Sequence, residues 1–112
     1  MNDPLMSYVD APKAVPVDGL PGVYVRESDF AQVLAYFDAM SKAKEDVSAY
    51  VRANTRLFIG SVCDESANLR YTDADADKLS KLPHRVATAL VKAISNVNGL
   101  NSRTVEAEAK NS

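Results

Sequence analysis

A row of apolar residues near the C-terminal end is the clearest pattern in this 112-residue sequence. Its members recur every three or four positions, as on one face of an α-helix: Val86, Leu90, Ile94 and Val97. Pro83 fits the first turn of such a helix, where its missing N–H costs no hydrogen bond. Asn98 and Gly99 supply a stop signal. The sequence therefore predicts a closing amphipathic helix from about Pro83 to Val97.

Two further helical segments are indicated between residues 29 and 59. In the first, Asp29 and Gln32 have the spacing of a capping box. The apolar residues of this segment have helical spacing and are Phe30, Val33, Leu34 and Phe37. In the second, from about Val47 to Ile59, Asn54 interrupts the apolar row, which comprises Val47, Tyr50, Val51 and Phe58. Gly60 fits a left-handed helix end. We expect two helices here, with one long helix as the alternative.

The rest of the chain shows shorter signals. Prolines at positions 4, 12 and 16 predict a loose N-terminal arm over residues 1–20. "GVYVRE" predicts a strand of about four residues, and residues 61–71 predict a small hairpin or an irregular loop. Residues 101–112 are polar and small, which predicts a flexible tail.

The fold class that we expect is mainly α: a small single domain over residues 21–100 with three to five helices and a short N-terminal strand. Its length suits one domain with a core of its own. The expected core comprises Phe30, Val33, Leu34, Phe37, Val51, Phe58, Leu79, Leu82, Val86, Leu90 and Ile94.

Composition narrows the possible environments and partners. A hydrophobic fraction of 46% with 25% charged residues is ordinary for a globular protein, and the net charge of −2 demands no polyanionic partner. No apolar run approaches the roughly 20 residues that cross a bilayer, and the N-terminus lacks the regions of a signal peptide. We therefore expect a protein that is made and kept in a cytosol.

The segment "YTDADADKL" places three aspartates on alternate positions, as at the start of a calcium loop: Asp73, Asp75 and Asp77. An EF-hand loop also needs glycine at its sixth position and glutamate at its twelfth, where this chain has Lys78 and His84. Thr72 is instead a good N-cap, and carboxylates in a first helical turn favour the helix dipole. The pattern predicts a short helix from Asp73 to about Leu82 and no metal site.

Residues for catalysis are equally scarce, so we expect no enzyme and no cofactor. Cys63 is the only cysteine and His84 the only histidine, which excludes an intrachain disulfide and a thiolate zinc cage. A Cys63–His84 nucleophile pair is conceivable, but Val62 beside Cys63 favours a buried, inert thiol. No glycine-rich phosphate-binding pattern occurs.

Charge suggests one alternative function. Residues 64–77 hold five acids, whereas residues 78–103 hold five basic residues and no acid. A small nucleic-acid-binding module that uses the basic C-terminal helix, with Arg85 and Lys92, is therefore the second hypothesis. We prefer a solvated face, because the acidic stretch beside the helix can neutralise its charge locally. The basic residues are also few and have no interleaved aromatics.

Three segments are informative through their order and spacing: "GVYVRE", "NTRLFIGSVCDESANLRYTDADADKLSKLP" and "NVNGL". In these segments the sequence resembles, over residues 15–101, the tail assembly chaperones of long-tailed bacteriophages. Asp64 and Glu65 match that family's acidic turn, and Tyr71, Thr72 and Asp73 match its aromatic-Thr-Asp segment. Leu79 matches its short helix, and Asn98, Gly99 and Leu100 match its end. The turn glycine of the family is missing, so Asn68 is expected to supply any left-handed conformation there.

The resemblance implies a non-enzymatic protein of the host cytoplasm that is absent from the mature virion. It would bind the tape measure protein, keep that long helical chain soluble and help to recruit tail tube subunits. A homo-oligomer is compatible with this role, whereas a membrane partner is not expected. Aromatic and other side chains beside the main apolar rows are the candidate contacts with the partner, which are Tyr36, Tyr50, Leu57, Arg85 and Lys92.

Overall fold

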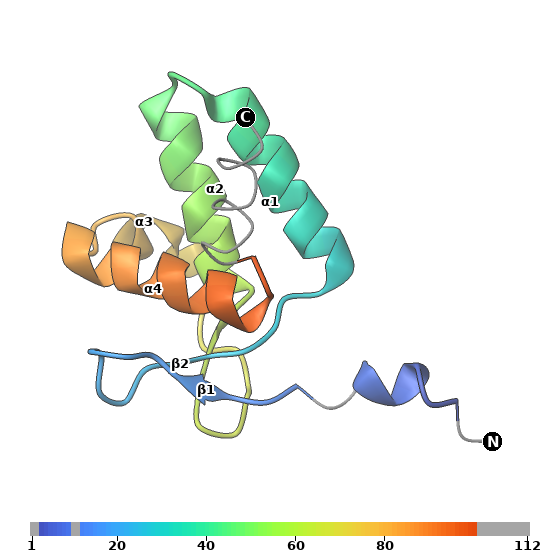
Figure 1. The fold of residues 1–112 in the computed structure, drawn as a ribbon. Coiled ribbons are helices and arrows are strands. Elements are labelled where there is room, and N and C mark those ends of the chain that lie inside the picture. Colours follow the sequence, from blue (N-terminus) through green and yellow to red (C-terminus); the bar gives the residue numbers. More distant parts are fainter. Residues whose placement is uncertain (1–2, 10–11, 101–112) are drawn as a thin grey trace, which may run out of the picture.

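The computed structural model describes residues 3–9 and 12–100. Four α-helices and a small sheet make up the body of the molecule, and a short N-terminal segment projects from it (Figure 1). The four helices are α1 (Phe30–Ala43), α2 (Val47–Ile59), α3 (Ala76–Leu79) and α4 (His84–Val97). The predicted tail, residues 101–112, lies outside the described residues.

Helices α1 and α2 form an antiparallel pair, so the prediction of two helices in this region is confirmed (Figure 1). Both begin at an aspartate: Asp29 accepts a hydrogen bond from Gln32 N at 2.7 Å, and Asp46 accepts one from Ala49 N at 3.1 Å. These caps satisfy backbone donors that have no partner within the helix.

Gly60 ends α2, as predicted, but not in the left-handed conformation, since its φ is −85°. The missing side chain at Gly60 instead leaves space for the amide group of Gln32 in α1, which a Cβ atom there would overlap.

The sheet has three antiparallel strands of two residues each, in the order β1 (Val15–Pro16), β2 (Tyr24–Val25) and β3 (Val62–Cys63). Val15 pairs with Val25, and Tyr24 pairs with Cys63. The predicted strand at "GVYVRE" is therefore present but shorter than expected. The prediction of a loose arm is wrong for residues 15–17, because β1 pairs with β2 and Val17 is buried.

A tight turn follows β3, and Leu69 returns to form a bridge with Cys63, as in a small hairpin. Asp64 Oδ1 accepts hydrogen bonds from Ser66 N at 2.8 Å and Asn68 N at 3.0 Å, and these bonds lower the pKa of its carboxyl group. The left-handed residue of this turn is Ala67, with φ 69°, and not Asn68 as expected. Arg26 donates a hydrogen bond to the Ala67 carbonyl at 2.9 Å and supports this conformation.

The three aspartates after Tyr71 begin a helical segment, as predicted. Residues Asp73–Asp75 form a 3₁₀ turn, η2, that leads into α3. Thr72 Oγ1 accepts from Ala74 N, while Asp75 Oδ2 accepts from Thr72 N at 2.9 Å, so the two side chains cap the turn reciprocally.

Helix α4 lies across one end of the α1–α2 pair and contacts β2 (Figure 1). It ends at Val97, as predicted, and Gly99 adopts the left-handed conformation with φ 73°. Asn98 Oδ1 accepts a hydrogen bond from Ser28 N at 2.9 Å, which ties the end of α4 to the segment between β2 and α1.

The core lies where α2, α3, α4 and the sheet meet. It consists of Val17, Val25, Leu57, Phe58, Val62, Leu79, Leu90 and Ile94. Four of these belong to the predicted core: Phe58, Leu79, Leu90 and Ile94. Val33, Val51, Leu82 and Val86 are half-buried. The prediction is wrong for Phe30, Leu34 and Phe37, which are exposed because no element of the described chain covers that face of α1.

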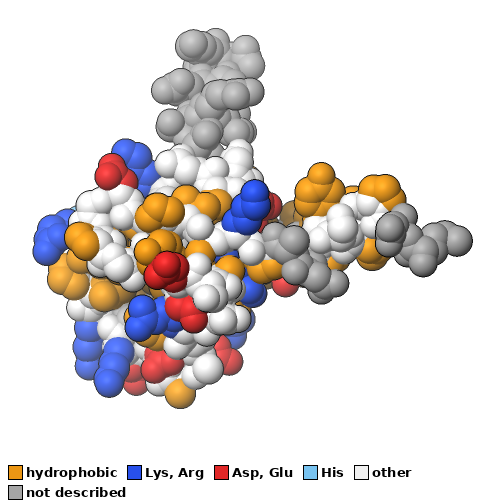
Figure 2. Space-filling model, turned by 90° about the horizontal axis from the view of Figure 1, so that it is seen from below, with side chains coloured by type: hydrophobic (Ala, Val, Ile, Leu, Met, Phe, Trp, Pro, Cys, Tyr) orange, Lys and Arg blue, Asp and Glu red, His pale blue; other side chains and the backbone are white. Residues whose placement is uncertain are grey.

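The described part of the N-terminal segment contains a 3₁₀ turn, η1 (Met6–Tyr8), and stands away from the body. Figure 2 shows that hydrophobic side chains gather on this projection. They are Leu5, Met6, Tyr8 and Val9, all of them exposed.

Candidate partner-binding surface

The first apolar surface is the exposed face of α1. Phe30, Leu34 and Phe37 lie at i, i+4 and i+7, so they form one row along the helix, and 79%, 51% and 49% of each residue is accessible. We refer to these three residues as the α1 stripe. Large apolar side chains grouped in this way on a surface are a common feature of protein-binding sites.

The adjacent face of α1 packs on α2 through a polar contact. Tyr36 donates a hydrogen bond from its hydroxyl to Asn54 Oδ1 at 3.2 Å, and Asn54 Nδ2 donates to the Tyr50 carbonyl at 3.0 Å. Burial, with a smaller contribution from Tyr50, raises the pKa of Tyr36 above its ordinary value of 10.0. Asn54, which interrupts the apolar row of α2 in the sequence, therefore holds α1 against α2.

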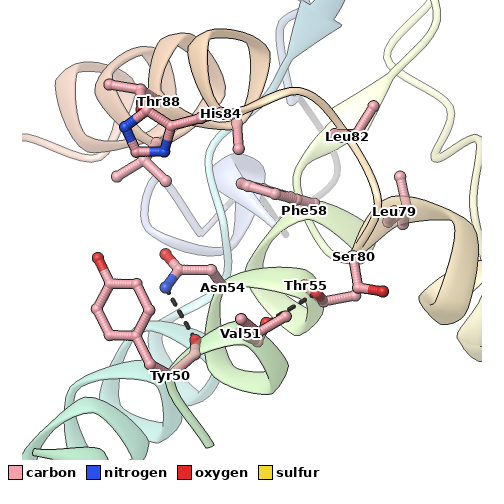
Figure 3. A pocket seen from close by; sticks show the side chains of 12 residues that line it. Tyr50, Val51, Asn54, Thr55, Phe58, Leu79, Ser80, Leu82, His84 and Thr88 are labelled. Atoms are coloured by element: carbon pink, nitrogen blue, oxygen red, sulfur yellow. Dashed lines mark hydrogen bonds between the residues drawn. The ribbon is translucent and has the colours of Figure 1, made fainter. Parts of the chain in front are cut away.

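The second apolar surface is a groove between α2 and α4, with a hollow of about 350 Å³ (Figure 3). Tyr50 projects from the α2 wall and His84 from the α4 wall. The hollow, which we call the α2–α4 groove, is lined by Tyr50, Val51, Asn54, Thr55, Phe58, Leu79, Ser80, Leu82, His84, Ala87, Thr88 and Val91.

A basic row runs beside this groove. Thr88 lines the groove. Arg85 lies three residues before Thr88, and Lys92 lies four residues after Thr88, so the three residues share one exposed side of α4. Helix α4 therefore has three successive sides around its axis. The first is buried and contains Leu90 and Ile94, the second lines the groove, and the third carries the basic row.

The structure separates the five candidate contacts predicted from the sequence. Tyr50 is half-exposed and lines the α2–α4 groove, while Arg85 and Lys92 lie on its edge. Tyr36 is half-buried and bonded to Asn54. Leu57 is only 4% accessible and belongs to the core, so its side chain is not part of either surface.

Sequence reasoning missed the α1 stripe by assigning its residues to the core. A signal was present, because Val33, Tyr36, Met40 and Ala43 give α1 a second apolar row beside the first. A helix at the edge of a small domain has one neighbour to pack on, so two adjacent apolar faces leave one of them uncovered.

Cys63 has no accessible surface, and burial raises the pKa of its thiol despite the opposing charge of Arg26. In the part of the chain that the structure describes, no three His, Cys, Asp or Glu side chains are placed to hold a metal ion. Across residues 3–9 and 12–100, no helix has the length and apolar character required to span a bilayer.

Comparison with known proteins gives an informative likeness among solved structures. No protein-family model and no curated protein sequence matches this chain. Among solved structures, the tail assembly chaperone of bacteriophage HK97 matches with a TM-score of 0.57 and 19% sequence identity, over 84% of this chain and 97% of that one. The expected resemblance is thus found again in three dimensions, and the chain has the fold of this phage tail assembly chaperone.

Proposed function

We propose that this chain is a phage tail assembly chaperone. In this role it binds the tape measure protein, keeps it soluble and helps to recruit tail tube subunits. It acts in the host cytoplasm, has no enzymatic activity and does not enter the mature virion. The likeness of nearly the whole fold to the HK97 protein supports the general role.

The α1 stripe carries the proposed binding step. A chaperone for a long helical chain must offer apolar surface without unfolding itself, because it replaces contacts that would otherwise lead its client to aggregate. The stripe meets this need, since Asp29 caps α1 and the Tyr36–Asn54 contact holds the adjacent face of the helix on α2. Phe30 and Phe37 then supply large apolar area on a folded helix.

Co-expression with the proposed client, the tape measure protein, tests the proposal. The wild-type chain should keep that protein soluble and co-purify with it. The triple variant Phe30→Ser, Leu34→Ser and Phe37→Ser should remain folded, because its changes lie on the surface, but should leave the tape measure protein in the pellet.

A matched variant, Val47→Ser with Leu69→Ser, removes exposed apolar side chains outside the stripe and should act as the wild type does. The proposal fails if the tape measure protein is equally soluble with and without the chain and the two never co-purify. If the wild type keeps the tape measure protein soluble and the triple variant does so equally well, the chaperone role stands and the stripe is not the contact surface.

A further inference from the structure

The α2–α4 groove has a different chemistry from the α1 stripe. Its lining includes no aspartate or glutamate, and its inner part is apolar, with Val51, Phe58 and Leu79 among the residues that surround the hollow. At about 350 Å³ it lies within the range of roughly 300–1,000 Å³ that binding pockets occupy, so it has room for more than one apolar side chain.

The polar groups inside the groove are already satisfied. Thr55 Oγ1 donates to the Val51 carbonyl at 2.8 Å, and Asn54 bonds to Tyr36 and to the Tyr50 carbonyl. Among the described residues, no buried side-chain nitrogen or oxygen lacks a partner. A group that enters the hollow therefore gains no hydrogen bond from its inner wall, and an apolar side chain suits it best.

The edge of the groove is positively charged. Helices α2 and α4 contain four basic residues and no acidic one: Arg52, Arg56, Arg85 and Lys92. Arg52 and Arg56 line a neighbouring hollow together with two acidic residues, Asp73 and Asp77. Arg85 and Lys92 are exposed and form no ion pair within the described part of the chain, where the ion pair found is Asp38–Lys42, on α1.

We propose that the α2–α4 groove binds an amphipathic protein helix with apolar anchors and an acidic flank. Its apolar side chains enter the hollow, and its carboxylates face Arg85 and Lys92. These two basic residues are seven positions apart on α4, about 10 Å along the helix axis. A partner helix that runs alongside α4 would therefore place its acids two turns apart, with its apolar anchors on the adjacent face.

Charge and shape together favour a protein helix over a nucleic acid. Phosphates would pair with the edge cations Arg85 and Lys92, and the apolar hollow beside them would stay empty. Base stacking would have to use Tyr50 and His84 at the walls of the groove, since Phe58 is 3% accessible. The inference rests on the groove and not on the proposed chaperone role, so either can fail without the other.

A pair of designed peptides tests the groove. The first is a helical peptide with two glutamates seven residues apart and leucines on the adjacent face, and the second has lysines in place of the glutamates. Fluorescence anisotropy with the full chain should show that the acidic peptide binds and that the lysine peptide binds roughly tenfold more weakly.

Two variants locate the contact. Arg85→Glu with Lys92→Glu should reverse the preference, so that the lysine peptide binds better than the acidic one. Thr88→Trp should fill the hollow and weaken both peptides alike. Lys13→Glu with Lys44→Glu, the same charge change away from the groove, should leave the preference intact. Circular dichroism and urea unfolding confirm that each variant is folded.

Three outcomes would overturn the inference. The two peptides could bind equally at low salt, or the charge reversal on α4 could leave the preference unchanged. Alternatively, neither peptide could bind while duplex DNA does. The DNA affinity would then be lost in the variant Arg85→Glu with Lys92→Glu. That last result would establish the basic helix as a nucleic-acid surface.

Discussion

Helices α1 and α4 are both 14 residues long and both carry a row of apolar side chains, but they use these rows differently. In α4, Leu90 is 4% and Ile94 1% accessible, and both belong to the core. In α1, the row of Phe30, Leu34 and Phe37 faces outward. The comparison teaches that periodicity predicts a helix and its faces, whereas neighbouring elements decide which face is covered.

The difference follows from position in the fold. Helix α4 lies between α2 and the sheet, so two elements cover its apolar row. Helix α1 packs on α2, and its second apolar row, with Tyr36 and Ala43, occupies that contact. The stripe of α1 is thus left free for a partner, while the free side of α4 carries charge.

The largest expected effect comes from the same substitution in the two helices. Leu90→Ala should lower the free energy of unfolding by about 2 to 5 kcal/mol, because it leaves a cavity in the core. Leu34→Ala should change it by about 0.5 kcal/mol or less, as surface substitutions do. Urea unfolding followed by circular dichroism measures both. Similar losses for the two variants would show that α1 buries its stripe in solution.

A smaller effect should separate the two tyrosines near Asn54. Tyr36→Phe removes the hydroxyl that donates to the buried Asn54 Oδ1, which should cost about 1 kcal/mol of unfolding free energy. Tyr50→Phe should cost much less, because within residues 3–9 and 12–100 its hydroxyl has no hydrogen-bond partner. Equal costs in urea unfolding would mean that the Tyr36–Asn54 contact does not hold α1 in place.

The turn between α1 and α2 offers a test with the opposite sign. Lys44 has φ 32° and ψ −96°, a conformation that strains a residue with a side chain, so Lys44→Gly should stabilise the fold by about 0.5 to 1 kcal/mol. Lys42→Gly, two residues earlier and inside α1, should destabilise it by about 1 kcal/mol. If both glycines destabilise in thermal unfolding, α1 continues past Lys44.

Much of this fold could be predicted from the sequence, because its signals are local. The bounds of α2, the aspartate and threonine caps and the stop at Asn98 and Gly99 depend on residues within a few positions of one another. The pairing of Val15 with Val25 could not be predicted, since strands of two residues give no alternating pattern. The left-handed residue of the turn is Ala67 in place of Asn68, and its carbonyl accepts a hydrogen bond from Arg26, which is far away in the sequence.

The candidate surfaces were harder to predict than the elements that carry them. Tyr50, Arg85 and Lys92 are exposed, as is typical of a polar or aromatic residue beside an apolar row, and their role as partner contacts stays a prediction. Leu57 and the α1 stripe could not be assigned to the core or to the surface, because an apolar residue on a helix has the same spacing in either place. Only the arrangement of α2, α4 and the sheet decides between these cases.

The subtlest expected effect is a pH dependence of the contact between α1 and α2. Because the pKa of Tyr36 is raised in the folded state, its hydroxyl ionises at lower pH when the chain is unfolded. The contribution of Tyr36 to stability is therefore fully present below about pH 10 and decreases as the pH rises through the higher folded pKa. The difference in unfolding free energy between wild type and Tyr36→Phe, measured in urea at about pH 8 and about pH 11, should shrink at the alkaline end. Other ionising groups occur in both proteins, so their effects cancel in this difference. A difference that stays constant with pH would show that Tyr36 is as hydrated in the folded chain as in the unfolded one. In that case Tyr36 does not hold α1 in place.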